Sequence, residues 1–129
     1  MAAASGGRTA DEYVAARRRN LEWVTAHLGA ALAVHDVLVS PAYMPAWKTD
    51  FALGHPPAGG AVTSPAAIGG LPIVTIPMGL VSGLPVGLAI VGARNSENLL
   101  VAVAREIEKS LGLSTDAAWR PRFTQPTRG

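Results

Sequence analysis

LPIVTIPMGLVSGLPVGLAIVG, residues 71–92, is the most apolar stretch of the chain and decides its fold. Because it carries no charged side chain, a membrane-spanning helix is the first interpretation to test. Pro72, Pro77 and Pro85 exclude such a helix, since each proline lacks a backbone N–H and breaks the hydrogen-bond ladder on which a spanning helix depends. Two short buried strands around a turn fit these residues better.

The stretch divides into two strands at its glycines and prolines. Residues 71–77 and 84–92 are both rich in branched side chains and are bounded by Gly or Pro, which is typical of strands. Residues 78–83 join them, and this length predicts a turn longer than the tightest hairpins, with Gly79 and Gly83 available for positive φ angles. We therefore expect an antiparallel pair or meander in an α/β fold, with both faces of the sheet covered.

One helix is predicted before these strands along the chain and another after them. Thr9 is followed three residues later by Glu12, the spacing of a capping box, so the first helix begins near residue 10 and runs to about residue 33. The second helix is capped by Asn95 or Ser96 and ends before Gly112. Its apolar stripe consists of Leu100, Val103, Ala104, Ile107 and Leu111.

The remaining segments predict one more strand and two connections. Residues 36–41 read as a short buried strand that ends at a proline. Residues 62–70 read as a connection, and residues 42–61 as a long Pro- and Gly-rich loop. A loop of this length is more often functional, or packed on something else, than idle in a compact domain. The loop carries Trp47, Lys48, Asp50 and His55.

Composition excludes several classes of protein. Among 129 residues, 11 Lys and Arg stand against 9 Asp and Glu, a net charge of +2, which is too small to attract nucleic acid or an acidic membrane surface. Without Cys there are no disulfides or thiolate metal sites, and three widely spaced His residues are a poor basis for zinc. We expect no metal, cofactor, nucleic acid or membrane as a partner. Since residues 1–7 lack a secretory signal, we expect a cytoplasmic protein.

Charged and polar residues give no convincing catalytic centre. A Ser/His/Asp set lacks the G-x-S-x-G turn that exposes a nucleophile, and neither a phosphate-binding loop nor a dinucleotide-binding glycine pattern is present. A serine activated by lysine needs a neutral amine. Lys109 lies near the end of a helix and Lys48 near Asp50, and both places keep the amine charged. The consecutive residues Arg17, Arg18 and Arg19 favour a solvated helix face over a basic docking patch.

Several motifs occur along the chain in a fixed order. TSPAAIGGLPIVTIPMG at 63–79 is followed by GLPVGL at 83–88, and then by Gly92, Ser96-Glu97 and Leu99-Leu100. This ordered set resembles the C-terminal block of the amidase signature family. PAWKTD at 45–50 and RPRF at 120–123 resemble the peptide-amidase-like branch, in which Ala is common at the position of Ala67. His55 departs from that branch, which tends to have Asp there. The resemblance covers about residues 10–124.

The resemblance implies carboxamide hydrolysis through an acyl-enzyme, with a serine nucleophile, a second serine in a cis peptide and a lysine. In the family these residues precede everything matched here, and this sequence has no GGSSGG-like segment and no corresponding lysine. No catalytic residue can therefore be assigned. The implied fold is the C-terminal portion of a mixed-sheet α/β/α fold, with two main helices and three or four strands. We divide the chain into a flexible N-terminus (1–8), a partial amidase domain (9–124) and a tail (125–129).

Trp47 and Asp50 are the candidate substrate-binding residues, at the rim of a pocket. The alternative is that Trp47 fills a gap under the loop and Asp50 makes a turn hydrogen bond. Three functions stay open: an amidase part that is inactive without an N-terminal half, a degenerate remnant that acts as an interaction or oligomerisation module, and an independent hydrolase. Exposed strand edges predict a homo-oligomer or a complex with the missing N-terminal half. A small amide is expected as substrate only in the complemented form.

Overall fold

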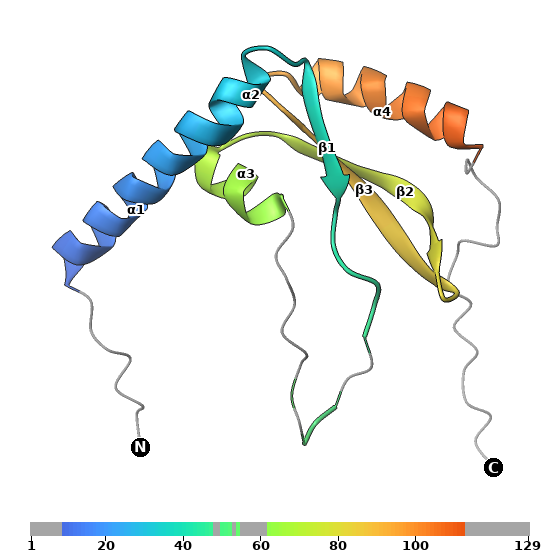
Figure 1. Ribbon diagram of the computed structural model, residues 1–129, viewed down its shortest axis with the longest axis horizontal. Helices are drawn as coiled ribbons and strands as arrows, with labels where there is room; N and C mark the ends of the chain where they lie inside the picture. Colours follow the sequence, from blue (N-terminus) through green and yellow to red (C-terminus); the bar gives the residue numbers. More distant parts are fainter. Residues whose placement is uncertain (1–8, 48–49, 53, 55–61, 113–129) are drawn as a thin grey trace.

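The computed structural model describes residues 9–47, 50–52, 54 and 62–112 (Figure 1). The predicted flexible N-terminus and tail, and the RPRF motif, lie outside these residues. The chain forms a small sheet, two long helical segments and one short helix. In chain order the elements are α1 (Ala10–Val24), the π-helical turn η1 (Thr25–Gly29), α2 (Ala30–Leu32), β1 (Val37–Pro41), α3 (Thr63–Gly69), β2 (Ile73–Val81), β3 (Leu84–Gly92) and α4 (Glu97–Leu111).

The predicted first helix is confirmed from residue 10 to residue 32. Its capping box is complete, because the Thr9 backbone N–H donates to Glu12 Oε2 at 2.7 Å and the Glu12 N–H donates to Thr9 Oγ1 at 3.3 Å. A π turn, which the sequence does not predict, joins α1 to α2. The three consecutive arginines are all exposed, and Arg18 pairs with Glu22 at 3.2 Å, as expected for a solvated face.

The capping box gives a direct test of the start of α1. Thr9→Ala removes the oxygen that accepts from Glu12 N–H, so the free energy of unfolding should fall by about 1 kcal/mol. Thr9→Ser keeps the hydroxyl and should stay close to the parent. Urea denaturation followed by far-UV circular dichroism measures both variants. An equal loss in the Ser variant would show that the methyl group matters, and not the cap.

The sheet has the strand order β1-β3-β2, and both pairings are antiparallel. The pairing of β2 with β3 confirms the predicted antiparallel pair. Residues 37–41 form a strand, as predicted, but the prediction that this strand is buried is wrong. β1 is an edge strand with one neighbour, Val39 is 57% exposed, and Pro41 lies within the strand opposite Leu88.

The turn between β2 and β3 is shorter than predicted. β2 continues to Val81, so only Ser82 and Gly83 form the turn, with φ angles of 51° and 77°. Positive φ at both positions matches the right-handed twist of the flanking strands, which explains the tight hairpin. β2 reaches this length because a register shift between Pro77 and Gly79 accommodates the proline on an edge strand.

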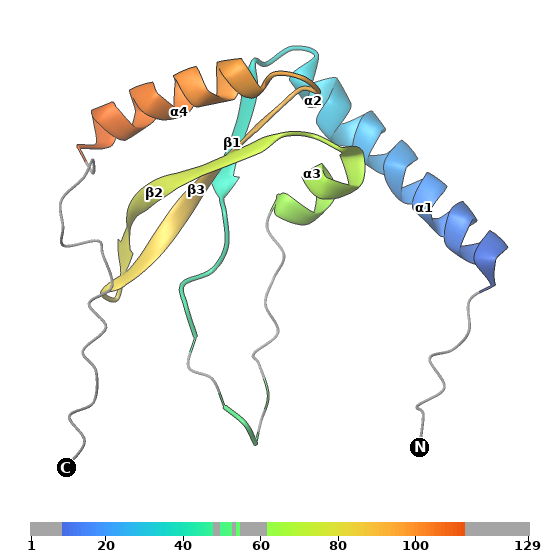
Figure 2. The ribbon, with the colours of Figure 1, turned by 180° about the vertical axis from the view of Figure 1, so that it is seen from behind.

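The prediction of an irregular connection at residues 62–70 is wrong, because Thr63–Gly69 form the short helix α3. Pro65 lies in the first helical turn, where the backbone N–H has no partner within the helix, so proline is tolerated. Gly70 ends the helix in the left-handed conformation, with φ 63°. Pro65 is therefore compatible with a short helix that begins at Thr63, and Gly70 ends it. α3 lies beside α1 in both views (Figures 1 and 2).

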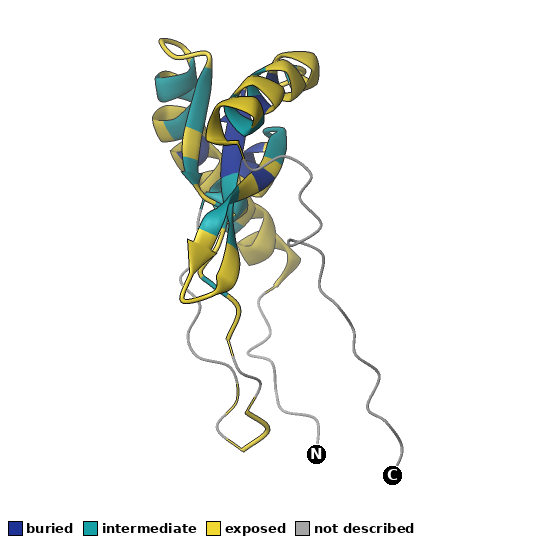
Figure 3. Ribbon diagram, turned by 90° about the vertical axis from the view of Figure 1, so that its right-hand side faces the viewer, coloured by how far each residue is buried: buried dark blue, intermediate teal, exposed yellow. Residues whose placement is uncertain are grey.

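The core lies between α4 and one face of the sheet. α4 begins after Ser96 and ends before Gly112, at the predicted positions, and packs on β2 and β3. The predicted side-chain cap is wrong, because the Ser96 hydroxyl makes no capping hydrogen bond and donates to the Ala93 carbonyl instead. The buried cluster is Ile76, Ile90, Leu100 and Ala104, against which Val103 and Ile107 pack. Figure 3 shows this buried centre and the exposed far end of the β2–β3 hairpin. Leu111, predicted in the stripe, is 42% exposed.

The opposite face of the sheet is covered over part of its length. Side chains alternate between the faces of a strand, so Ala89 and Val91 point away from α4. Both are fully buried, whereas Thr75, which pairs with Ala89, is exposed. The expectation of cover on both faces therefore holds for one end of the sheet. No helix among the described residues combines the length and the apolar character needed to cross a bilayer.

Candidate functional site

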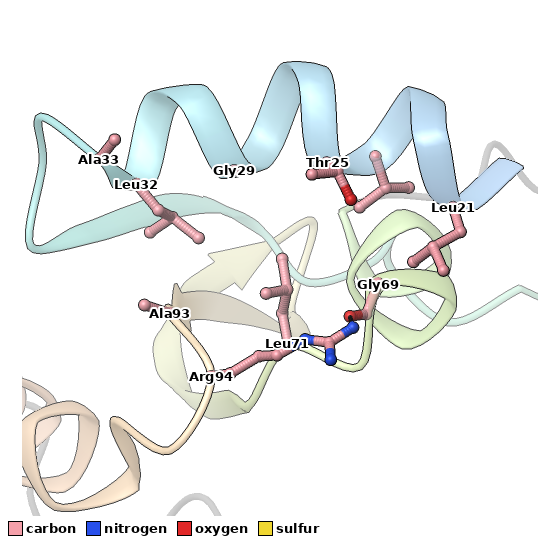
Figure 4. A pocket seen from close by; sticks show the side chains of 10 residues that line it. Leu21, Thr25, Gly29, Leu32, Ala33, Gly69, Leu71, Ala93 and Arg94 are labelled. Atoms are coloured by element: carbon pink, nitrogen blue, oxygen red, sulfur yellow. Dashed lines mark hydrogen bonds between the residues drawn. The ribbon is translucent and has the colours of Figure 1, made fainter.

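A cavity of about 480 Å³ lies between the N-terminal helical segment and the segments that flank the sheet (Figure 4). One wall is helical, and the other is formed where α3 leads into β2 and where β3 leads into α4. The lining residues are Leu21, Val24, Thr25, Gly29, Leu32, Ala33, Gly69, Leu71, Ala93 and Arg94.

The helical wall is built from residues spaced along one face. Leu21, Thr25 and Gly29 follow one another at intervals of four, and Leu32 continues the same face. The π turn Thr25–Gly29 lies in the middle of this wall, and such turns are common at functional sites. Gly29 leaves its part of the wall without a side chain.

Arg94 crosses the opposite wall toward the end of α3. Its Nη2 donates a hydrogen bond to the carbonyl oxygen of Gly69 at 2.7 Å, which orients the guanidinium of this exposed residue toward the end of the helix. A Cβ at Gly69 would lie 2.6 Å from Val24 Cγ1, so only glycine allows α1 and α3 to approach this closely. The Arg94 hydrogen bond and the close helix contact thus meet at one residue.

The cavity has the chemistry of a binding site. Most of its lining is apolar, and its polar side chains are the guanidinium of Arg94 and the hydroxyl of Thr25. Nucleophilic catalysis needs a nucleophile beside a base, and no lysine, histidine or carboxylate is among the ten lining residues. Across the described residues, no group of three or more His, Asp and Glu is placed to hold a metal ion.

Trp47 and Asp50, the predicted pocket rim, do not line this cavity. The rings of Trp47 and Tyr43 lie 6.1 Å apart at 46°, and the Trp47 side chain is 38% exposed. Asp50 Oδ1 accepts a hydrogen bond from the Ala52 backbone N–H at 2.8 Å, as the alternative turn interpretation expects. A role of these two residues at a substrate pocket stays a prediction.

The other candidate polar residues are not gathered here either. Ser40 donates to its neighbour Pro41, Ser64 is exposed on α3, and Lys109 is exposed in the last turn of α4. Lys48 and His55 lie outside the described residues. Sequence reasoning missed Arg94, although a signal existed: it is the first Lys, Arg, Asp or Glu after Asp50.

Comparison with known proteins gives sequence matches over most of the chain. No protein-family model matches. A glutamyl-tRNA(Gln) amidotransferase subunit of Tropheryma whipplei (strain Twist) is 32% identical over 112 residues, which are 84% of this chain and 21% of that protein. The protein of the same name from Rubrobacter xylanophilus is 37% identical over 90 residues, covering 64% of this chain and 18% of the relative.

Solved structures agree with these matches. The peptide amidase from Stenotrophomonas maltophilia superposes with a TM-score of 0.66 at 35% identity, covering 84% of this chain and 22% of that chain. A bacterial aryl acylamidase of the amidase signature enzymes has a TM-score of 0.67 at 20% identity, covering 92% of this chain and 27% of that chain, which shows a shared fold. The chain spans about a fifth of the length of the curated relatives that it matches.

Proposed function

Because the chain resembles part of the amidase-signature enzymes in sequence and in fold, we propose that it is the C-terminal part of an amidohydrolase of this kind. It would contribute to carboxamide hydrolysis only when another polypeptide segment supplies the serine, serine and lysine residues. The observation that carries the proposal is the joint match to the peptide amidase, 35% identical with a TM-score of 0.66 over 84% of the chain. The proposal includes a location in the cytoplasm. The absence of Cys is compatible with that reducing compartment.

The hydrogen bonds of three serines among the described residues support the view that these three are not nucleophiles. The hydroxyls of Ser40, Ser96 and Ser110 each donate to a backbone carbonyl, at 3.1, 2.7 and 2.8 Å. A serine becomes a nucleophile when a neighbouring base takes its proton. A carbonyl oxygen does not act in this way, so these three serines are structural within the part of the chain that the structure describes.

Exposed apolar side chains support the need for a partner. Leu80, Val81 and Leu84 at the end of the β2–β3 hairpin are 58%, 49% and 41% exposed, and Tyr13 and Val14 on α1 are 63% and 62% exposed. These are two separate groups of exposed apolar side chains, at opposite ends of the molecule in Figure 1, and exposed apolar groups of this kind are typical of surfaces that another polypeptide covers. In the proposed assembly, the nucleophile-bearing segment covers these residues.

The same surfaces favour self-association when no such segment is present. We predict that the purified chain forms a homo-oligomer, because apolar side chains are exposed and the outer edges of β1 and β2 have no neighbouring strand among the described residues. Multi-angle light scattering over a wide concentration range measures this. A monomer at every concentration would contradict the prediction and would also remove the support for the alternative function as an oligomerisation module.

The proposed function is tested first on the chain alone. The purified 129-residue protein should show no detectable hydrolysis of a C-terminal peptide amide or of an aryl amide. Turnover that disappears when a single serine is replaced would overturn the proposal, because it would reveal an independent active site. Turnover that survives replacement of every serine would identify a contaminating hydrolase.

A further inference from the structure

We propose that the cavity beneath the π turn binds a small carboxylate that carries an apolar tail. The proposal concerns binding and needs no catalytic residue, so it is independent of the proposed amide hydrolysis. It rests on three features: the size of the cavity, its apolar walls, and the single guanidinium held at one end.

The size and walls define the tail of the ligand. A volume of about 480 Å³ lies within the range of small-molecule sites, which are mostly apolar and carry a few fixed polar groups. Leu21, Val24, Leu32 and Leu71 surround the space with aliphatic carbon. A phenyl ring or a short alkyl chain fits such walls, and its transfer from water provides most of the favourable free energy of binding.

Arg94 defines the head of the ligand. A guanidinium has five N–H donors, and the hydrogen bond to the Gly69 carbonyl uses a donor of Nη2. That hydrogen bond holds the planar group in place, and a fixed guanidinium fork matches the two oxygens of a carboxylate. The cavity lining contains no Asp or Glu that would neutralise this charge. An anion is therefore favoured and a cation is repelled.

Thr25 adds a second polar contact on the facing wall. It lies within the π turn, and its hydroxyl is on the cavity side of the helix (Figure 4). The arrangement places one hydroxyl on the helical wall and one guanidinium on the opposite wall, with aliphatic side chains between them. A ligand with an apolar body and a single anionic end satisfies all of these groups at once.

The test compares an acid with its neutral analogue on the full chain. The probes are 3-phenylpropanoate and 3-phenylpropanamide, which share the apolar body and differ in charge. Titration followed by ¹H–¹⁵N NMR should move the backbone amides of Thr25–Gly29, Gly69, Leu71 and Arg94. The acid should bind about tenfold more tightly than the amide, as expected for a charge-assisted hydrogen bond.

Two substitutions test separately how the anionic end and the apolar body of the ligand contribute to binding. Arg94→Gln removes the charge and shortens the side chain by two bonds, so both the guanidinium fork and the Nη2 donor to the Gly69 carbonyl are lost. The affinity for the acid should fall about tenfold, and the affinity for the amide should fall much less. Gly29→Leu fills the cavity and should abolish binding of both probes. Gly29→Ala adds only a Cβ, which would meet Thr25 Cγ2 at an ordinary 3.8 Å in a helical backbone, so it should stay folded and weaken both probes far less than Gly29→Leu does. Circular dichroism confirms that each variant is folded.

Three results would overturn the proposal. Equal affinity for the acid and the amide would show that Arg94 does not recognise the head group. Shifts confined to residues outside the cavity would place the ligand elsewhere. Retained binding in a folded Gly29→Leu variant would show that the cavity is not the site. None of these outcomes bears on the assay of amide hydrolysis, so the two proposals can fail separately.

Discussion

Replacing Leu100 by Ala should lower the free energy of unfolding by about 2–5 kcal/mol. Leu100 is fully buried, and it connects α4 to Ile76 and Ile90 on the sheet. The substitution removes three buried carbon atoms, so the free energy gained by burying them is lost. It also leaves a void, because the closely packed neighbours fill the space only in part. Chemical denaturation followed by circular dichroism gives the value.

Leu99 provides the matched control for this prediction. It is the preceding residue of the same helix and has the same side chain, but it is 42% exposed. Leu99→Ala should therefore change the free energy of unfolding by about 0.5 kcal/mol or less, as surface substitutions usually do. Equal effects of the two substitutions would mean that α4 does not pack on the sheet through Leu100.

Gly92→Ala should lower the free energy of unfolding by about 1–3 kcal/mol. Gly92 ends β3 beneath the start of α4, and a Cβ there would collide with Ser96 Oγ and approach Leu100 Cδ2 to 3.0 Å. The Ser96 hydroxyl is held by a 2.7 Å hydrogen bond to the Ala93 carbonyl, so it cannot move away without loss. The added methyl group would force strand and helix apart.

A second substitution tests this explanation. In Gly92→Ala/Ser96→Ala the nearest colliding atom is gone, whereas the contact with Leu100 Cγ at 3.1 Å remains. The double variant should recover part of the stability that Gly92→Ala loses, relative to Ser96→Ala alone. A double-mutant cycle in urea measures this coupling. Full additivity, or a Gly92→Ala variant as stable as the parent, would contradict the tight approach of α4 to β3.

Residues close together in the sequence correctly predict the helix ends, the packing face of α4 and the β2–β3 pair. The Thr9 and Glu12 pair predicts the start of α1, and Gly112 predicts the end of α4, because each acts within one helical turn. The stripe at Leu100, Val103, Ala104 and Ile107 identifies the face of α4 that meets the sheet. The antiparallel β2–β3 pair follows from two apolar strands joined by a short segment.

Other features depend on contacts that the sequence does not reveal. β1 pairs with β3 across more than forty residues, at an edge of the sheet away from β2, and Val39 is exposed there. Pro65 is compatible with a helix or a loop, and packing of α3 against α1 decides between them. The cavity joins Thr25 to Arg94 from opposite halves of the described chain, so no spacing rule could have predicted it.

Complementation of amide hydrolysis tests the proposed function most directly. The chain is mixed with the part of the Stenotrophomonas maltophilia peptide amidase outside the region that it matches, and release of ammonia from a peptide amide is measured. A parallel mixture with that enzyme's own matched segment is the control. We predict no turnover by either component alone and turnover in both mixtures. Turnover in the control mixture, with none in the mixture that contains a folded preparation of this chain, would contradict the proposal.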